Sequence, residues 1–374
     1  MRGGWILGAG LLLALGGFSG LTGPAAAAVA PDWRPIVSPA QQLFPSLLIA
    51  TANLAAPPPG GAILGDPHGL VGIAVEATRD GQRARVSVRA PGLGEESSVD
   101  VVLARAGEWY QVYPTMLWDF ERLHAQQRAA PATLEFALAL DGQAQPRKVQ
   151  RVRVRAVNDA PYSVADGGLR TDLSWMFAAY VDEDNALVQR ILGEALAAGH
   201  VARFDGYQSG DPGQVYRQVF AIWRVLAARG IRYSSIARTS AQDQAVLSQY
   251  VRFLDESWGN RQANCVDGAV LLASVLRRID LDPQLVLVPG HMFLGFALEP
   301  GGQQMAWLET TRLGEVAAEA GEDALLENFQ DAVEDGHARY AQAAARFGRA
   351  DAPEYRLIDI AAARRLGVAP IAGR

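Results

Sequence analysis

The spacing of apolar residues changes once along this chain, from alternation at every second position to the spacing of an α-helix. From about Leu70 to Val157, short runs of alternating apolar and polar residues are separated by turn-forming residues. Recurring short strands of this kind are typical of an antiparallel, Ig-like β-sandwich. Beyond Gly168 the spacing becomes helical, which predicts a second domain of a different class. The 374 residues also exceed what one hydrophobic core usually organises.

The domain boundaries are predicted from turn formers. Residues 158–168 concentrate Asn, Asp, Pro and Gly where the period changes, so we place the boundary there. We expect a β-sandwich domain at 68–160 and an α+β domain at 168–374. The segment 29–67 is rich in Pro and Gly and is expected to be a loosely organised lead-in.

One hairpin is predicted within the alternating half. The run Ile73–Ala77 leads into a turn at Asp80-Gly81, and the run Arg85–Arg89 returns. Asp-Gly between two alternating runs is a strong signal for a hairpin with a tight turn.

The N-terminus is predicted to direct export. Arg2 precedes the apolar run Trp5–Leu15 and the small residues Ala25–Ala30, which is the three-part pattern of a signal peptide at residues 1–28. An uncleaved membrane anchor is the alternative, because Trp5–Leu21 is nearly long enough to span a bilayer. We therefore expect a bacterial protein of the periplasm or the medium, with membrane contact only through this segment.

Charge and histidine spacing exclude several classes of function. The net charge of −6 provides no basic field for nucleic acid, so no nucleic-acid partner is expected. The five histidines show no H-x-x-x-H or H-E-x-x-H spacing, which argues against a zinc hydrolase. No acidic loop has the ligand spacing of a calcium site. We expect neither a metal nor another cofactor.

Helices are predicted throughout the second half. Asp211-Pro212 provides an N-cap and a first-turn proline, and Gly230 stands where that helix is expected to stop. The runs 186–198 and 241–256 also have helical spacing. A later helix, 321–347, is expected to pack on the domain, with covering of the site as the alternative.

Cys265 is the only cysteine, in the stretch GNRQANCVDG. Asn264 is a strong N-cap residue, and Asp267 is the acidic member of a capping box. Both are expected to support a site at the first position of a helix of about 15 residues. Positive partial charge at that end favours the nucleophilic thiolate. An unpaired thiol in an exported chain forms an intermolecular bridge, is a free reactive thiol, or is a small buried hydrophobe.

Three strands are predicted after this helix. They cover residues 284–288, 291–298 and 305–310, and the turn EPGGQ joins the last two as a hairpin. Leu298 is expected to pair with Gln304 across that turn, which sets the register for the whole hairpin.

This register brings a histidine and a carboxylate together. His291 then lies opposite Thr311, and Phe293 lies opposite Glu309, so His291 and Glu309 are diagonal neighbours on one face. A cysteine nucleophile needs a base, and the base needs an orienting group. Cys265, His291 and Glu309 are therefore the candidate catalytic residues.

The run NCVDGAVLLASVLRRIDLDPQLVLVPGHMFLGFALEPGGQQMAWLETT resembles the core of the transglutaminase-like (papain-like) cysteine superfamily. That family has a helix-starting Cys followed by x-Asp, a His-Ala-Trp strand and a Trp-x-x-Asp-x-Thr strand. Cys265, Asp267, His291 and the run Trp307–Thr311 match these motifs in turn. The segment Gly230–Tyr233 resembles the one that commonly precedes the cysteine helix. The resemblance excludes the alternating half of the chain.

The chain departs from the family pattern in four ways. One is a short interval between Cys265 and His291, because the usual intervening loop is missing. Ala263-Asn264 replaces Gly-Gln or Gly-x, His-Met-Phe replaces His-Ala-Trp, and Glu309 replaces Asp. A glutamate can also orient a histidine. We expect the Cys265 amide and Gln262 to bind an oxyanion, with helix capping or solvent exposure as the alternative role of Gln262.

The resemblance implies acyl transfer at an amide. We expect an exported cysteine peptidase or amidase acting on a protein or peptide of the cell envelope, because water needs no dedicated binding site as acceptor. A cross-linking or deamidating transglutaminase is one alternative. A non-catalytic envelope binding or assembly protein that keeps the fold is another.

Overall fold

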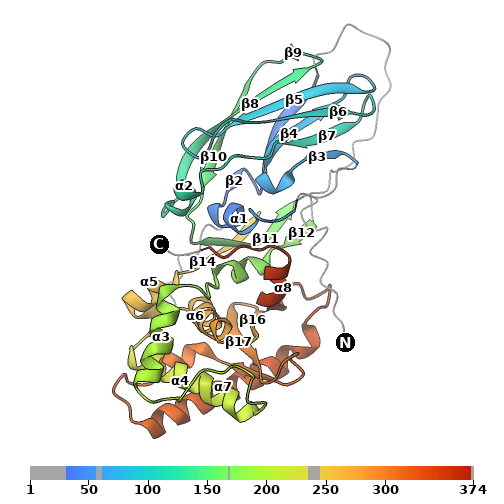
Figure 1. Ribbon diagram of the computed structural model, residues 1–374. Helices are drawn as coiled ribbons and strands as arrows, with labels where there is room; N and C mark the ends of the chain where they lie inside the picture. Colours follow the sequence, from blue (N-terminus) through green and yellow to red (C-terminus); the bar gives the residue numbers. More distant parts are fainter. Residues whose placement is uncertain (1–30, 56–60, 167–168, 235–244, 372–374) are drawn as a thin grey trace. The chain divides into compact units, whose positions relative to one another are not determined.

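The computed structural model describes residues 31–55, 61–166, 169–234 and 245–371, so the predicted signal peptide lies outside it. The described residues form two compact units: those within 31–171 and 245–248 form one, and those within 172–234 and 249–371 form the other (Figure 1). Both helices and strands occur, consistent with the predicted multidomain α+β class. Within the described ranges, no helix has the length and apolar character needed to cross a membrane.

The first unit contains two principal β-sheets. One has the order β1-β4-β7-β3, formed by Trp33–Val37, Val71–Glu76, Trp109–Tyr113 and Ile63–Gly65. The other has the order β2-β10-β8-β5-β6, with β9 beside β8, formed by Gln42–Leu43, Lys148–Val154, Ala130–Leu140, Gln82–Arg89, Ser97–Leu103 and Gln143–Ala144. Its short helices are α1 (Pro45–Ala50), η1 (Pro67–Gly69) and α2 (Phe120–His124). Along β5 buried and exposed residues alternate, as the period-two pattern predicts.

Two features of this unit differ from the sequence expectations. The described part of segment 29–67 is not a loose lead-in, since it supplies β1 and the edge strands β2 and β3, and the two edge strands pair in parallel. The prediction of a hairpin at Asp80-Gly81 is wrong, because β4 pairs with β1 and β7 whereas β5 pairs with β6 and β8. A turn signal reverses the chain locally, but distant partners decide which strands share a ladder.

A third sheet has the order β12-β11-β14, formed by Leu169–Asp172, Asp159–Asp166 and Val246–Tyr250. The prediction of a helix at 241–256 is therefore wrong over Val246–Tyr250, which form β14. Residues 241–244 of that range lie outside the described residues. Val246 and Ser248 are buried and Leu247 is exposed, a period-two pattern too short to distinguish from a helix in the sequence. Helix α5 begins only at Leu254 and ends at Asn260.

The second unit begins with η2 (Ser174–Tyr180), α3 (Ala186–Ala197) and α4 (Pro212–Ala228). The predicted start of α4 is confirmed, because the Asp211 side chain accepts a hydrogen bond from the Gly213 amide at 2.8 Å. Gly230 has a φ of +72°. The residue after the helix thus has a left-handed backbone conformation, which glycine adopts most easily.

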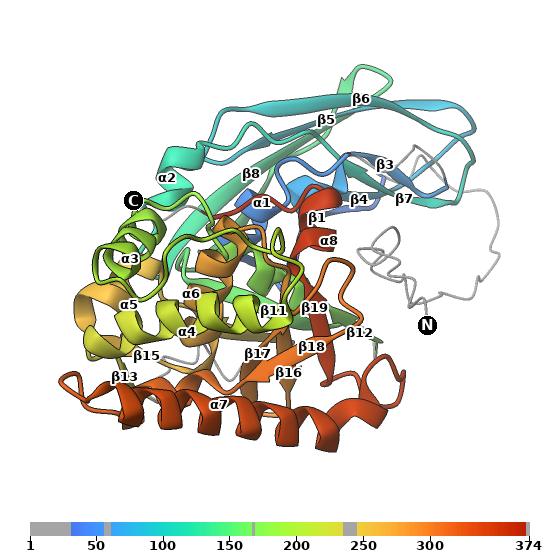
Figure 2. The same cartoon turned by 60° about the horizontal axis from the view of Figure 1, so that its bottom comes forward.

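An antiparallel sheet of order β18-β17-β16-β19 forms the centre of this unit, built from Met305–Leu308, His291–Ala297, Pro283–Val288 and Arg356–Asp359. Helix α6 (Cys265–Arg278) packs against β16 and β17, and α7 (Glu322–Ala343) packs against β18 (Figure 2). The remaining elements are β13 (Arg232–Tyr233), β15 (Gln262–Ala263), η3 (Thr310–Glu315), η4 (Ala344–Arg346) and α8 (Ile360–Arg365).

Helix α7 approaches β18 closely at a glycine. A methyl group added at Gly336 would overlap the backbone of Trp307 and Leu308. One turn along, the Tyr340 ring stacks on Trp307 with the ring centres 3.7 Å apart and the planes at 9°. The predicted packing role of helix 321–347 is thus confirmed, and Gly336 sets its distance from the strand.

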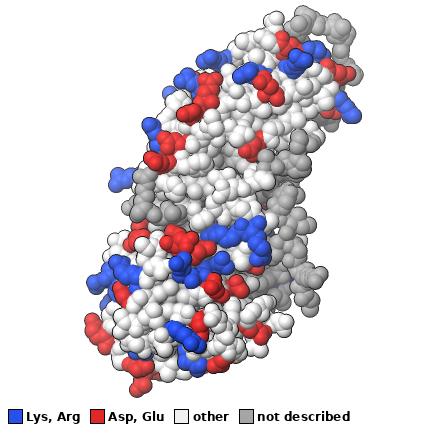
Figure 3. All heavy atoms as spheres, viewed as in Figure 1, with Lys and Arg blue, Asp and Glu red and all other residues white. Residues whose placement is uncertain are grey.

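The surface carries charges of both signs. Acidic and basic side chains are interspersed over the face shown in Figure 3. Many are paired, for example Arg85 with Asp100 at 3.2 Å and Arg217 with Asp211 at 2.8 Å. Such exposed pairs contribute little to stability.

Two glycine-to-alanine substitutions should have opposite effects on the free energy of unfolding. Gly336→Ala should destabilise by about 1–3 kcal/mol, because α7 must move away from β18. Gly193→Ala should stabilise by about 0.5–1 kcal/mol, because this exposed position inside α3 has open space around it. Urea unfolding of both variants measures this, and equal effects would contradict the close packing of α7.

Candidate active site

The start of α6 is closed by a reciprocal cap, as predicted. The Asn264 Oδ1 atom accepts hydrogen bonds from the amides of Val266 and Asp267, both at 2.9 Å. In return, the Asp267 Oδ2 atom accepts from the Asn264 amide at 2.9 Å. Cys265 is therefore the first residue of the helix, and it is partly exposed while Val266 and Asp267 are buried.

Asp267 also holds the preceding segment against the helix. Its carboxylate accepts from the Arg252 amide at 2.8 Å and from the Arg252 Nη1 atom at 2.6 Å. The Asp267 side chain is fully buried, and burial raises its pKa against the opposing effect of these hydrogen bonds. All its contacts are structural, in line with the supporting role predicted for it and for Asn264.

His291 is positioned by the tight turn between β16 and β17. It is the first residue of β17 and pairs with Val288, and Gly290 between them has a φ of +72°. Such a φ is unfavourable for residues with a side chain, which explains glycine at this position. The turn fixes the imidazole at the end of the strand, where it is partly exposed.

The predicted register of the next hairpin is confirmed. Leu294 pairs with Leu308, Gly295 pairs with Trp307, and the Leu298 amide donates to the Gln304 carbonyl at 2.9 Å. Strand β18 ends at Leu308, so the next residue emerges on the face that carries His291.

That next residue, Glu309, is buried and bonded through both carboxylate oxygens. The His291 Nε2 atom lies 2.6 Å from Oε2, while the Thr311 hydroxyl and amide donate to Oε1 at 2.7 and 3.1 Å. Its own amide donates to the Ala332 carbonyl of α7 at 2.8 Å. Burial raises the pKa of Glu309, but the bonds from His291 and Thr311 and the charge of His291 hold it below its usual value.

His291 joins the carboxylate to the thiol. Burial by itself lowers the pKa of His291, but hydrogen bonds with Cys265 and Glu309 outweigh this effect and raise it to about 9. Because Nε2 faces Glu309, the sulfur is left to face Nδ1, the other ring nitrogen. The structure thus brings Cys265, His291 and Glu309 together as one connected set, in the order that the sequence predicted.

Gln262 and Tyr233 lie on neighbouring strands beside this set. Gln262 is exposed in β15, and β13 runs parallel to β15 so that Tyr233 lies opposite Ala263. Burial and the negative charges of Cys265 and Glu309 raise the pKa of Tyr233. Tyr233 also lines one hollow with Asn264 and Thr310, the chain neighbours of these two residues. The segment that contains Tyr233 resembles the one that precedes the cysteine helix in the family, but its sequence predicts no role for this residue.

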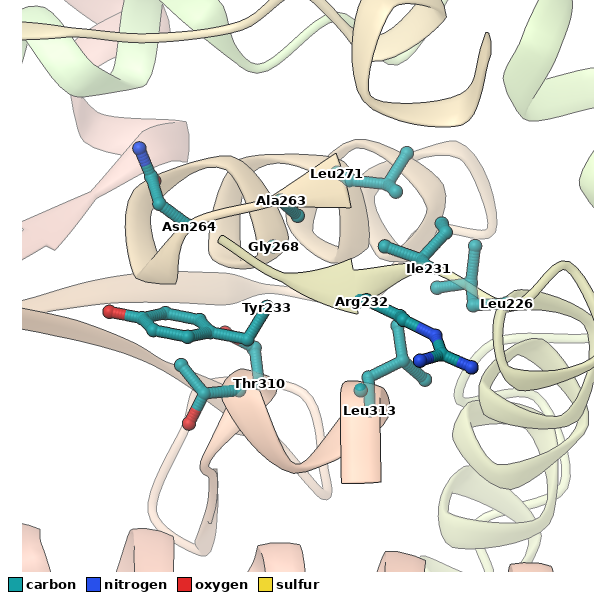
Figure 4. Close-up of a pocket in the computed structure, with 12 residues that line it drawn as sticks. Leu226, Ile231, Arg232, Tyr233, Ala263, Asn264, Gly268, Leu271, Thr310 and Leu313 are labelled. Atoms are coloured by element: carbon teal, nitrogen blue, oxygen red, sulfur yellow. The ribbon is translucent and has the colours of Figure 1, made fainter. Parts of the chain in front are cut away.

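A small hollow adjoins the site (Figure 4). Tyr233, Asn264, Gly268 and Thr310 line part of it, and they come from β13, the cap and body of α6, and η3. A methyl group added at Gly268 would lie 3.0 Å from the Thr310 hydroxyl oxygen, so glycine permits η3 to approach α6 closely. This approach keeps Glu309, which directly precedes η3, next to the cysteine helix.

No family model matches the chain, and no curated protein matches its sequence. The resemblance to the transglutaminase-like superfamily accordingly stays a prediction. Over the described ranges, no group of three or more His, Cys, Asp or Glu side chains is arranged to hold a metal ion.

The raised pKa of His291 predicts a pH dependence of stability. Because the folded state binds this proton more tightly than the unfolded state, the contribution of His291 is complete below about pH 6.5 and is lost as the pH rises through about 9. The free energy of unfolding of the wild type minus that of His291→Asn should therefore decrease across this range. Urea unfolding at a series of pH values measures the difference, and a constant value would contradict the connected set.

The buried helix cap at Asp267 should contribute more to the free energy of unfolding than an exposed cap does. Asp267→Ala should destabilise by about 3–5 kcal/mol, because Arg252 then loses its buried partner. Asp211→Ala, which removes an exposed N-cap from α4, should destabilise much less. Similar losses for the two variants in thermal or urea unfolding would show that the Asp267 network is not required.

Proposed function

We propose that this chain is a cysteine hydrolase that cleaves amide or peptide bonds. The observation that carries the proposal is that His291 has two hydrogen-bond partners, the Glu309 carboxylate at Nε2 and the Cys265 thiol. A nucleophile, a base within reach of it and a third group that orients the base are the requirements for acyl transfer through a covalent intermediate.

In the first half of the reaction, the thiolate of Cys265 attacks the carbonyl carbon of an amide and forms a C–S bond. The imidazolium of His291 donates its proton to the leaving nitrogen as the C–N bond breaks. An amine departs, and a thioester with a neutral imidazole is left. The raised pKa of His291 supports this step, because the imidazole is protonated at neutral pH.

In the second half, His291 accepts a proton from water as the water oxygen attacks the thioester. The C–S bond breaks, a carboxylic acid leaves, and the thiolate and imidazolium are restored. An amine in place of water gives a cross-link instead. We favour water, because it reaches a partly exposed cysteine without a dedicated acceptor site.

The oxyanion of the tetrahedral intermediate needs hydrogen-bond donors. The cap uses the amides of Val266 and Asp267, so the Cys265 amide is the first-turn donor available to substrate. Tyr233 is favoured over Gln262 as the second donor, because its phenol lies close enough to Cys265 to be affected by its charge.

The finer description of the fold belongs to the same proposal. The cysteine helix, the strand that begins with His291 and the strand that leads to Glu309 support a transglutaminase-like or papain-like assignment of the second unit. The two sheets of the first unit support an Ig-like sandwich. An exported protein acting on peptides or proteins of the cell envelope remains the proposal for its location and partners.

Mass spectrometry of a bacterial periplasmic extract tests the activity. Wild type should generate new peptide termini that Cys265→Ala does not. Glu309→Gln should slow their formation by roughly 10²–10⁴-fold, because the imidazole loses its orienting partner. His337→Gln, at an exposed histidine of α7, should leave the rate unchanged.

The alternatives give different results. Deamidation or cross-links in place of new termini would assign a transglutaminase. A substrate-independent control is alkylation by iodoacetamide at about pH 6, where Cys265 should react faster than a free thiol, since thiolate is the reactive form. Slow alkylation together with no product specific to the wild type would favour a binding or assembly protein.

A further inference from the structure

One charged group beside the connected set takes no part in the mechanism above. The Nε atom of Arg339, on α7, lies 2.8 Å from Glu309 Oε2, the same oxygen that faces His291 Nε2 at 2.6 Å. The Glu309 side chain is only 2% exposed, whereas that of Arg339 is 48% exposed. The guanidinium therefore reaches from the surface to a buried carboxylate.

The position of Arg339 is fixed by the packing of its helix. Gly336 contacts the backbone of Trp307, and Tyr340 stacks on the Trp307 ring, on either side of Arg339 in the sequence. Nearer the start of α7, the Asn328 side chain donates to the Arg312 carbonyl at 3.0 Å and accepts from the Trp223 indole at 3.0 Å. Helix α7 thus presents Arg339 to the carboxylate from a fixed distance.

We propose that Arg339 is a positioning residue that acts on His291 through Glu309. By sharing Oε2, Arg339 offsets part of the negative charge that stabilises the imidazolium, and so sets the upper pH at which the thiolate–imidazolium pair persists. The inference rests on the proposed function only in that this pair is the reactive form of the site.

The other groups that face the pair do not duplicate this effect. Cys265 of α6 and Tyr233 of β13 approach from the side of the thiol, and Thr311 donates to the opposite oxygen, Oε1. The Asp267 carboxylate of α6 forms an ion pair with Arg252. On α7, the Asp335 carboxylate forms an ion pair with Arg312, with Nη2 and Oδ2 2.7 Å apart. Arg339 is the cationic residue of α7 that contacts the Glu309 carboxylate.

The test is an NMR titration of the His291 ring in the full chain, with its signals assigned by their loss in His291→Asn. In Arg339→Gln, the midpoint of deprotonation should rise by about 0.5 pH unit, a roughly threefold change in proton affinity, as expected for a partly exposed charge. Arg339→Lys, which keeps the charge, should stay near the wild type. Arg217→Gln removes an exposed ion pair between Arg217 of α4 and Asp211 and should leave the midpoint unchanged.

An unchanged midpoint in Arg339→Gln would overturn the proposal. A lower midpoint would also overturn it, because Arg339 would then strengthen, rather than weaken, the attraction of Glu309 for the imidazolium of His291. Should Arg339→Gln unfold, Arg339→Met keeps the packing of the side-chain stem and gives the same comparison. The titration needs no substrate, so a shifted midpoint in a chain without hydrolase activity separates this inference from the proposed function.

Discussion

The buried carboxylate of Glu309 is the constraint on which the arrangement of the site depends. A charge removed from water is costly unless its oxygens find hydrogen-bond donors or cations. Thr311 supplies donors to one oxygen, and His291 and Arg339 approach the other. These partners come from η3, β17 and α7, so satisfying one side chain holds three elements around the end of β18.

The second fixed point is the start of α6. The cap formed by Asn264 and Asp267 is buried, and Arg252 extends it to the segment before α5. The residues that follow Cys265 along the helix are buried as far as Leu276. The thiol stands at the first position of this buried helix, where it is partly exposed to solvent.

Features set by near neighbours in the sequence were predictable. The capping box at Cys265 depends on residues three positions apart, and the register of β17 and β18 follows from one short turn. Features set by distant partners were not. The sequence predicts a helix where β14 forms, because a five-residue segment has no decisive period until β11 lies beside it. The turn at Asp80-Gly81 likewise connects two sheets rather than one hairpin.

The sequence by itself determined the helix start that carries Cys265 and the strand pairing that aligns His291 with Glu309, because both follow from short-range hydrogen bonding and pleat geometry. Only the tertiary structure decided that Tyr233 approaches the thiol and that Arg339 shares the carboxylate. These two side chains come from β13 and α7, whose positions are set by packing against β15 and β18, and no local pattern in the sequence encodes that packing.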